Sequence, residues 1–163
     1  CGTPEMMAPE AIDGSGSTCA ADWWALGVVI YECMVGHTPF RAATPFRVCC
    51  LVQAGLQEDD LPEQASASLW WPALVKELLV LDPTERLPMR PGHINNVTGH
   101  EWYTTCPEFD WDALTNQTMD APYIPAVTGP EDTTQFDCKD MQMPEDFGAD
   151  EASFEFDDFE NIR

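Results

Sequence analysis

The sequence predicts a mainly α-helical domain followed by an extended acidic tail. The chain has 163 residues, of which 44% are hydrophobic, and this is enough for one domain with a sizeable core. Segments with helical start and stop residues occupy most of the chain up to about residue 103. The composition changes near Cys106, and the part beyond it carries 16 of the 29 acidic residues and two of the seven basic ones. These observations predict a domain of residues 1–106 and a tail of residues 107–163.

The net charge restricts the classes of partner. It is −22 at pH 7. A chain this acidic is repelled by nucleic acids and by anionic membrane surfaces. We therefore expect a basic protein or peptide as the partner, and neither nucleic acid nor membrane.

The cysteines indicate the cellular compartment. They number seven, an odd count without paired CxxC spacing, which suits neither a disulfide framework nor a zinc site. The longest apolar run, residues 23–31, is shorter than the roughly 20 residues that span a bilayer, and no basic region precedes an apolar one at the N-terminus. We therefore expect a reducing, cytoplasmic location and no membrane-spanning or secretory segment.

The first predicted elements are a loop and a long helix. Residues 1–12 are rich in Pro and Gly and form an ordered loop that ends in a short helical turn. Residues 13–18 have the composition of a flexible surface loop. The helix of about residues 21–35 ends at Gly36, with Pro39 just beyond it. Because this helix is apolar almost all round, we expect it to be buried on every side at the centre of the fold.

Two carboxylates interrupt this apolar helix. Asp22 lies in its first turn, where free backbone amides and the helix dipole favour an acid. Glu32 lies near its end, and a buried carboxylate costs on the order of several kcal/mol unless it is paired or hydrogen-bonded. On spacing alone, Asp22 is equally well explained as a simple capping or first-turn acid.

Three later segments are predicted to be helical. The helix of residues 45–54 has Thr44 as its cap and a proline at its first position. A wide apolar stripe predicts a helix of residues 70–82, which Pro83 ends. A last short helix covers residues 94–102.

The tail is predicted to lack a core of its own, because it combines many prolines with a heavy negative charge. Its aromatic residues are too numerous for a solvating linker, so we expect it to lie along a surface with its rings in pockets. After about residue 144 the prediction is partial disorder. The aromatic residues in question are Phe109, Trp111, Tyr123, Phe136, Phe147, Phe154, Phe156 and Phe159.

Four motifs in the first part of the chain resemble one protein family. Their order and spacing are similar to those of the C-terminal lobe of eukaryotic serine/threonine protein kinases, whose activation segment ends in Ala-Pro-Glu. Each motif is weakly specific alone, and the four together are strongly specific. They are CGTPEMMAPE at residues 1–10, DWWALGVVIYE at 22–32, GHTPF at 36–40 and DPTERL at 82–87.

The tail motifs narrow the resemblance to the AGC group, and within it to the cyclic-AMP- and cyclic-GMP-dependent kinases. The resemblance covers roughly residues 1–137, and it implies a helical lobe over residues 1–106 with the group's C-terminal extension over 107–163. The tail motifs are HEWY at residues 100–103, FDWDAL at 109–114, APYIP at 121–125 and GPEDTTQF at 129–136.

The resemblance implies a substrate-binding role for several residues. Thr3 is similar to the threonine that hydrogen-bonds the catalytic Asp and Lys elsewhere in the kinase, and a hydroxyl suits this because it both donates and accepts. Pro4 and Met7 match positions that shape the apolar pocket for the residue after the phosphorylated one. Glu5 and Glu32 match acids that pair with substrate arginines, and such pairing explains a preference for basic substrates.

The resemblance also implies structural roles. Glu10 and Arg86 look like the family's buried ion pair, which ties the activation segment to the last helices. Asp22 looks like the helix acid that braces the catalytic loop. The alternative for Glu32 is an internal ion pair with Arg41 or Arg86.

The chain contains no Gly-rich GxGxxG loop, no HRD motif and no DFG motif, which phosphoryl transfer requires together with a phosphate-binding lysine. The resemblance therefore implies a fragment whose missing N-lobe and catalytic loop lie in a longer parent, which would use ATP and magnesium. The fragment alone is expected to bind neither and to be inactive.

Phe136 matches the aromatic residue that reaches over the adenine pocket. Met6 replaces the usual Tyr, and residues 137–139 depart from the group's pattern.

Three hypotheses about function follow. The leading one is a serine/threonine kinase that phosphorylates arginine-containing substrates, to which this chain contributes substrate-binding and structural parts. A regulatory cyclic-nucleotide-binding domain or subunit is a further implied partner. The second is a pseudokinase or regulatory module that binds a basic partner without catalysis. The third is a truncated product with no stable fold.

Overall fold

The computed structural model describes residues 2–61 and 70–135, and it divides the chain into two compact units, Cys1–Met119 and Asp120–Arg163. Within the described residues every regular element is helical, and none of these helices is both long and apolar enough to cross a membrane. The predicted mainly α fold is confirmed. In chain order the helices are η1 (Pro4–Met6), α1 (Pro9–Asp13), α2 (Ala20–Val35), α3 (Pro45–Ala54), η2 (Glu58–Asp60), α4 (Trp71–Leu78), η3 (Pro83–Glu85), η4 (Leu87–Met89), α5 (Ile94–Thr98), α6 (Glu101–Thr104) and α7 (Trp111–Thr115).

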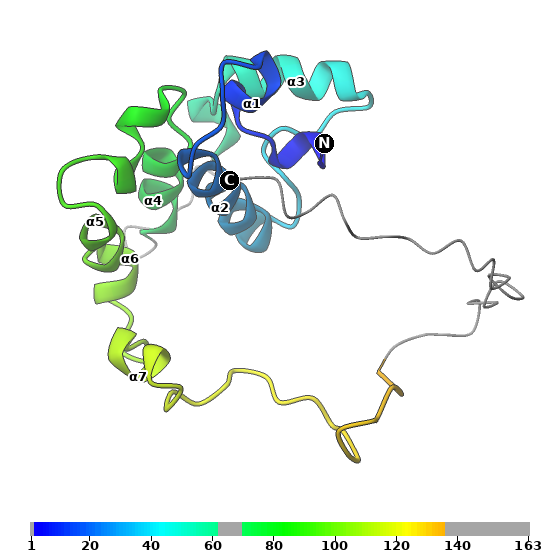
Figure 1. The fold of residues 1–163 in the computed structure, drawn as a ribbon, viewed down its shortest axis with the longest axis vertical. Helices are drawn as coiled ribbons and strands as arrows, with labels where there is room; N and C mark the ends of the chain where they lie inside the picture. The colour runs from blue at the N-terminus through cyan, green and yellow to red at the C-terminus, as the bar shows by residue number, and fades with distance from the viewer. Residues whose placement is uncertain (1, 62–69, 136–163) are drawn as a thin grey trace, which may run out of the picture. The chain divides into compact units, whose positions relative to one another are not determined.

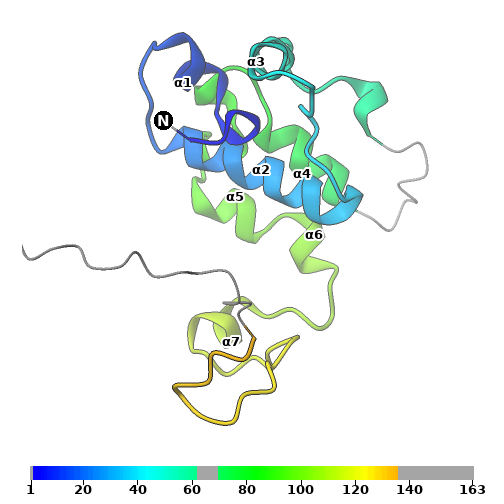
Figure 2. The same cartoon turned by 90° about the vertical axis from the view of Figure 1, so that its right-hand side faces the viewer.

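The centre of the first unit is the packed pair of helices α2 and α4. Figures 1 and 2 show α1 and α3 on one side of this pair and α5 and α6 on the other. The two helices approach closely at Gly27, where an added Cβ would lie 2.9 Å from Leu79 Cδ2. The core around them consists of Ala8, Trp24, Val28, Ile30, Tyr31, Phe40, Val48, Val52, Trp71, Leu74, Val75, Leu78, Leu79, Leu87 and Val97.

The predicted central helix is present, but the prediction that it is buried on every side is wrong for the described structure. Helix α2 packs against α4, η1, η3 and η4. Val29 and Met34 are more than 40% exposed, and Cys33 is exposed as well. Cys33 and Met34 lie four and five positions after Val29, so the three residues share one face of the helix. An apolar composition all round indicates that a helix can be buried, but it does not say which faces its neighbours cover.

Two predicted helix boundaries match the structure. Helix α2 ends at Val35, and Gly36 adopts the left-handed conformation with φ 89° that this cap requires. Helix α3 begins with Pro45, and the side chain of Thr44 accepts a hydrogen bond from the backbone N–H of Arg47 at 3.4 Å. Local capping chemistry was therefore sufficient to predict these boundaries.

Two other predicted helices are shorter than expected. Helix α4 ends at Leu78, and Asp82 instead caps η3 by accepting a hydrogen bond from the N–H of Thr84 at 2.9 Å. The predicted helix of residues 94–102 is two helices, because His100 is extended and its ring nitrogen Nδ1 accepts from the N–H of Trp102 at 3.1 Å. An apolar stripe continues across such breaks, so it does not reveal them.

The first part of the predicted tail belongs to the first compact unit. The ring centroids of Phe109 and Trp111 lie 5.2 and 4.8 Å from that of Tyr103, and Trp111 Nε1 donates to the carbonyl of Thr98 at 3.1 Å. For these two rings the prediction of surface packing is confirmed. The first unit ends at Met119, beyond the composition change near residue 106.

In the second unit the described residues 120–135 form turns without a helix. Asp132 accepts hydrogen bonds from the backbone and side chains of Thr134 and Thr128, and these bonds hold the pKa of its carboxyl group well below the ordinary range. Tyr123 is 71% exposed, so the prediction that its ring lies in a pocket is wrong for the described residues. The later aromatic residues of the tail, from Phe136 on, lie outside the described residues.

A truncation at the interface of α2 and α4 tests this core. Leu74 is fully buried, so Leu74→Ala should lower the free energy of unfolding by about 2–5 kcal/mol, because it leaves a cavity. Leu51 on α3 is 41% exposed, and Leu51→Ala is the matched control with a much smaller expected loss. Urea unfolding followed by circular dichroism measures both. Equal losses in the two variants, or a wild-type chain without a cooperative transition, would contradict this fold.

Candidate functional site

The predicted substrate loop starts with the short helix η1. The N–H of Met6 donates to the carbonyl of Thr3 at 2.9 Å, and the N–H of Met7 donates to the carbonyl of Pro4 at 3.2 Å. The proline at the first helical position favours this turn. Thr3 is exposed, whereas Pro4 and Met7 are half-buried. Helix η1 packs against α2 and α3, which fixes the loop on the helical body.

Glu5 is held by a residue that the sequence motifs did not indicate as part of the site. Its Oε2 accepts a hydrogen bond from the hydroxyl of Thr38, which is 5% exposed. Thr38 belongs to the GHTPF motif that follows α2. The motif itself was recognised, but nothing in it indicated that its threonine contacts a glutamate 33 residues earlier.

Glu32 lies near the end of α2 and is half-buried. The ion pairs among the described residues join Arg86 to Glu10 and Lys76 to Glu58. Neither of them involves Glu32, and Arg41 is exposed. The alternative of an internal ion pair between Glu32 and either arginine therefore has no support in the described part of the chain.

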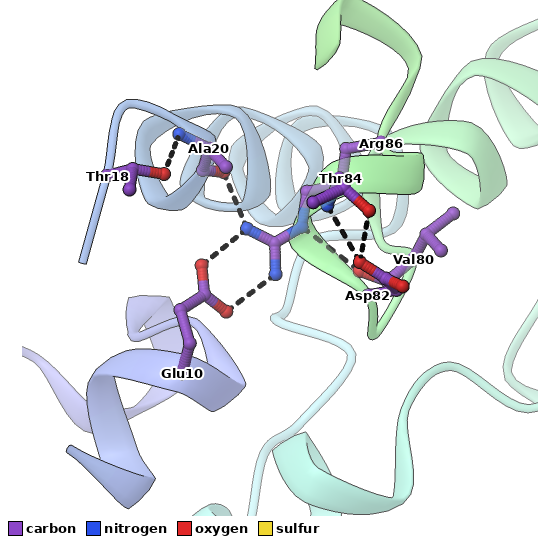
Figure 3. Close-up of polar contacts among 7 residues, drawn as sticks. All are labelled: Glu10, Thr18, Ala20, Val80, Asp82, Thr84 and Arg86. Carbon is purple, nitrogen blue, oxygen red and sulfur yellow. Dashed lines mark hydrogen bonds and ion pairs between the residues drawn. The ribbon is translucent and has the colours of Figure 1, made fainter. Parts of the chain in front are cut away.

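The structure brings Glu10 and Arg86 together in a buried two-pronged ion pair. Arg86 Nη1 and Nη2 donate to Glu10 Oε1 and Oε2, each at 2.7 Å, as Figure 3 shows. Arg86 is completely buried and Glu10 is 6% exposed. The two residues are 76 positions apart, so the pair connects helix α1 with the segment between η3 and η4.

The guanidinium group of Arg86 also holds two other segments (Figure 3). Its Nη1 donates to the carbonyl of Ala20 at 2.6 Å and its Nε to the carbonyl of Val80 at 3.0 Å. Its central carbon lies 5.1 Å from the ring centroid of Trp24, a cation–π contact. Arg86 therefore joins the start of α2, the end of the α4 segment and the activation-segment motif. The motif alignment implied only the contact with Glu10.

The charge state of Glu10 follows from these contacts. Burial raises the pKa of a carboxyl group, because the charged form loses its water. The hydrogen bonds from Arg86 and from the Glu10 backbone, together with the guanidinium charge, outweigh burial and hold the pKa of Glu10 below its ordinary value of 4.5. The pair is therefore ionised at neutral pH.

Asp22 occupies the first turn of α2 but is exposed, and it makes no side-chain cap bond. The hydroxyl of Thr18 instead accepts from the N–H of Ala20 at 3.2 Å. The remaining predicted site residue, Phe136, lies outside the described residues. Among residues 2–61 and 70–135, no three His, Cys, Asp or Glu side chains gather closely enough to hold a metal ion.

Comparison with known proteins identifies the family. Residues 1–103 match the protein kinase domain model, which is more than half of the chain. The chain belongs to the protein kinase family. The motifs that suggested this family therefore indicated it correctly.

Relatives of this chain include cyclic-GMP- and cyclic-AMP-dependent kinases, as the tail motifs indicated. The chain is 39% identical over 137 residues to the cGMP-dependent protein kinase egl-4 of Caenorhabditis elegans. The matched region is 84% of this chain and 17% of that protein. It is 34% identical over 157 residues to cGMP-dependent protein kinase isozyme 1 of Drosophila melanogaster, covering 94% and 20%. It is 36% identical over 137 residues to the human cAMP-dependent protein kinase catalytic subunit PRKX, covering 84% and 36%. The kinase chain thus spans well under half the length of each.

Removing one partner tests the buried ion pair. Glu10→Gln leaves the buried Arg86 without its counter-charge, so the free energy of unfolding should fall by about 3–5 kcal/mol. Glu58→Gln, which breaks the exposed pair with Lys76, is the matched control with little expected change. Urea unfolding at neutral pH measures both variants.

The same comparison across pH gives a second readout. Because the pKa of Glu10 is lowered on folding, its contribution is present above about pH 4.5 and is lost as the pH falls below that value. The difference in stability between wild type and Glu10→Gln should therefore narrow on acidification. A difference that stays constant from neutral pH to pH 3 would refute this role for the carboxylate.

Proposed function

We propose that this chain is the substrate-binding and structural part of a longer serine/threonine kinase, which transfers the γ-phosphate of ATP to serine or threonine in arginine-containing sequences. Family membership and the identity to cGMP- and cAMP-dependent kinases support this class. In this proposal the longer protein supplies the N-lobe, the catalytic loop and the sites for ATP and magnesium. It is cytoplasmic, and a cyclic-nucleotide-binding domain or subunit regulates it.

The observation that carries the proposal concerns two acids on elements that pack together. Glu5 is on η1 and Glu32 is on α2, and these two elements are in contact. Within the described ranges, neither acid is in an ion pair with a basic side chain of the chain itself. The hydroxyl of Thr38 holds one oxygen of Glu5 and leaves the other for a ligand. Glu32 can then accept two parallel hydrogen bonds from a substrate arginine, and the remaining oxygen of Glu5 can accept one.

The other site residues have supporting roles in this proposal. The half-buried Pro4 and Met7 shape an apolar pocket for the substrate residue that follows the phosphorylated one. The exposed hydroxyl of Thr3 bonds the catalytic Asp and Lys of the longer protein, and the exposed Asp22 braces its catalytic loop. Phe136 contacts the adenine. The buried pair of Glu10 and Arg86 holds the loop that carries Thr3, Pro4 and Met7.

A pseudokinase or regulatory module would use the same two acids to hold a basic partner. Binding and phosphate transfer are therefore measured separately. Phosphate transfer by the full-length protein to a serine peptide with preceding arginines supports the kinase. Tight binding of that peptide without transfer supports the regulatory module instead.

A substitution that removes the charge of Glu32 but keeps its size tests the role of this residue. In the full-length protein, Glu32→Gln should reduce the preference for arginine over alanine before the phosphorylated residue by about tenfold or more, because a charge-assisted hydrogen bond contributes about 1.5–3 kcal/mol. A peptide array scored by phosphorylation measures the preference. Glu58→Gln, an exposed acid on η2, is the matched control. An unchanged ranking of the peptides in Glu32→Gln would overturn the assignment.

A further inference from the structure

The region around α6 and α7 contains a cavity that the proposed substrate site does not use. The cavity has a volume of about 370 Å³, which lies within the range typical of ligand sites. Figures 1 and 2 both place α7 away from the N-terminal η1, which carries Glu5. Six residues line the cavity: Tyr103, Thr104, Phe109, Asp110, Trp111 and Asp112.

Three of the lining residues form an aromatic cluster. The ring centroids of Phe109 and Trp111 are 4.8 Å apart with an interplanar angle of 87°, and Tyr103 lies 4.8 Å from Trp111 and 5.2 Å from Phe109. The hydrogen bond from Trp111 Nε1 to the carbonyl of Thr98 fixes the indole in place. Burial raises the pKa of the Tyr103 hydroxyl, so its ring is uncharged at neutral pH. Aromatic faces of this kind attract cations.

Two carboxylates stand at the same cavity. Asp110 uses Oδ1 to accept from the N–H of Ala113 at 2.8 Å, which fixes the start of α7, and its other oxygen is not used in that bond. Asp112 is exposed. The ion pairs found in the described part of the chain do not involve either aspartate. Two carboxylates and three aromatic rings therefore line the same cavity.

The sequence provides no basic residue near these acids along the chain. Residues 91–138 contain neither lysine nor arginine, although Glu101 and Glu108 add further negative charge beside the cavity-lining segment. The charge complement of this surface is therefore a cation. A guanidinium group suits it best, because it is planar, stacks on aromatic rings and donates several hydrogen bonds to carboxylates.

We propose that this cavity binds an arginine side chain of a basic polypeptide, with the guanidinium group against the cluster of Tyr103, Phe109 and Trp111 and its N–H groups donating to Asp110 and Asp112. The proposal is independent of the substrate site at Glu5 and Glu32. It gives the chain a second contact for a basic protein.

The test uses the full chain with ¹⁵N-labelled tryptophan and the peptide acetyl-Gly-Arg-Gly-amide. The indole N–H resonance of Trp111, assigned by its loss in Trp111→Phe, should shift progressively on titration. The same peptide with citrulline in place of arginine, which keeps the shape and removes the charge, should leave the resonance unchanged. Asp112→Asn should weaken the response to the arginine peptide by about tenfold, whereas Asp59→Asn, at an exposed acid on η2, should not.

Two results would overturn the proposal. One is a Trp111 resonance that does not respond to the arginine peptide or responds equally to the citrulline peptide. The other is a response that Glu32→Gln abolishes and Asp112→Asn does not, because the resonance would then be reporting binding at the proposed substrate site. A response that survives Glu32→Gln supports the cavity, whatever the outcome for the substrate site.

Discussion

The buried guanidinium group of Arg86 connects the parts of the chain on which the candidate site depends. Its hydrogen bonds reach Glu10 in the activation-segment motif, the carbonyl of Ala20 at the start of α2, and the carbonyl of Val80 after α4. A charge buried this deeply costs free energy unless its donors are paired, and here three chain segments accept four hydrogen bonds from it. The position of the loop with Thr3 and Glu5 is therefore coupled to the packing of the helical core.

The fold places recognition residues and structural residues on the same short elements. Helix η1 carries Glu5 and packs against α2, which carries Glu32. The hydroxyl of Thr38 adds a second anchor to Glu5 from the loop after α2. Such anchoring preorganises the carboxylates, so that less ordering is required when a basic ligand binds.

The sequence was sufficient for features set by local chemistry and by motifs. The capping residues Thr44 and Gly36 predicted two helix boundaries, and the spaced motifs predicted the family. The sequence was insufficient for side-chain contacts and exposed faces that depend on residues far apart in the chain. The Thr38 bond to Glu5 and the exposed face at Val29 depend on which segments meet in space, and a one-dimensional pattern does not contain that information.

Amide hydrogen exchange in Arg86→Lys measures the central coupling most directly. Lysine keeps the charge but cannot form the two-pronged bond, so the amides of Ala11 and Ile12, which bond the carbonyl of Ala8, should lose much more protection than that of Thr105 after α6. Equal losses at these amides, or full protection of the amides that follow Glu10, would contradict the account.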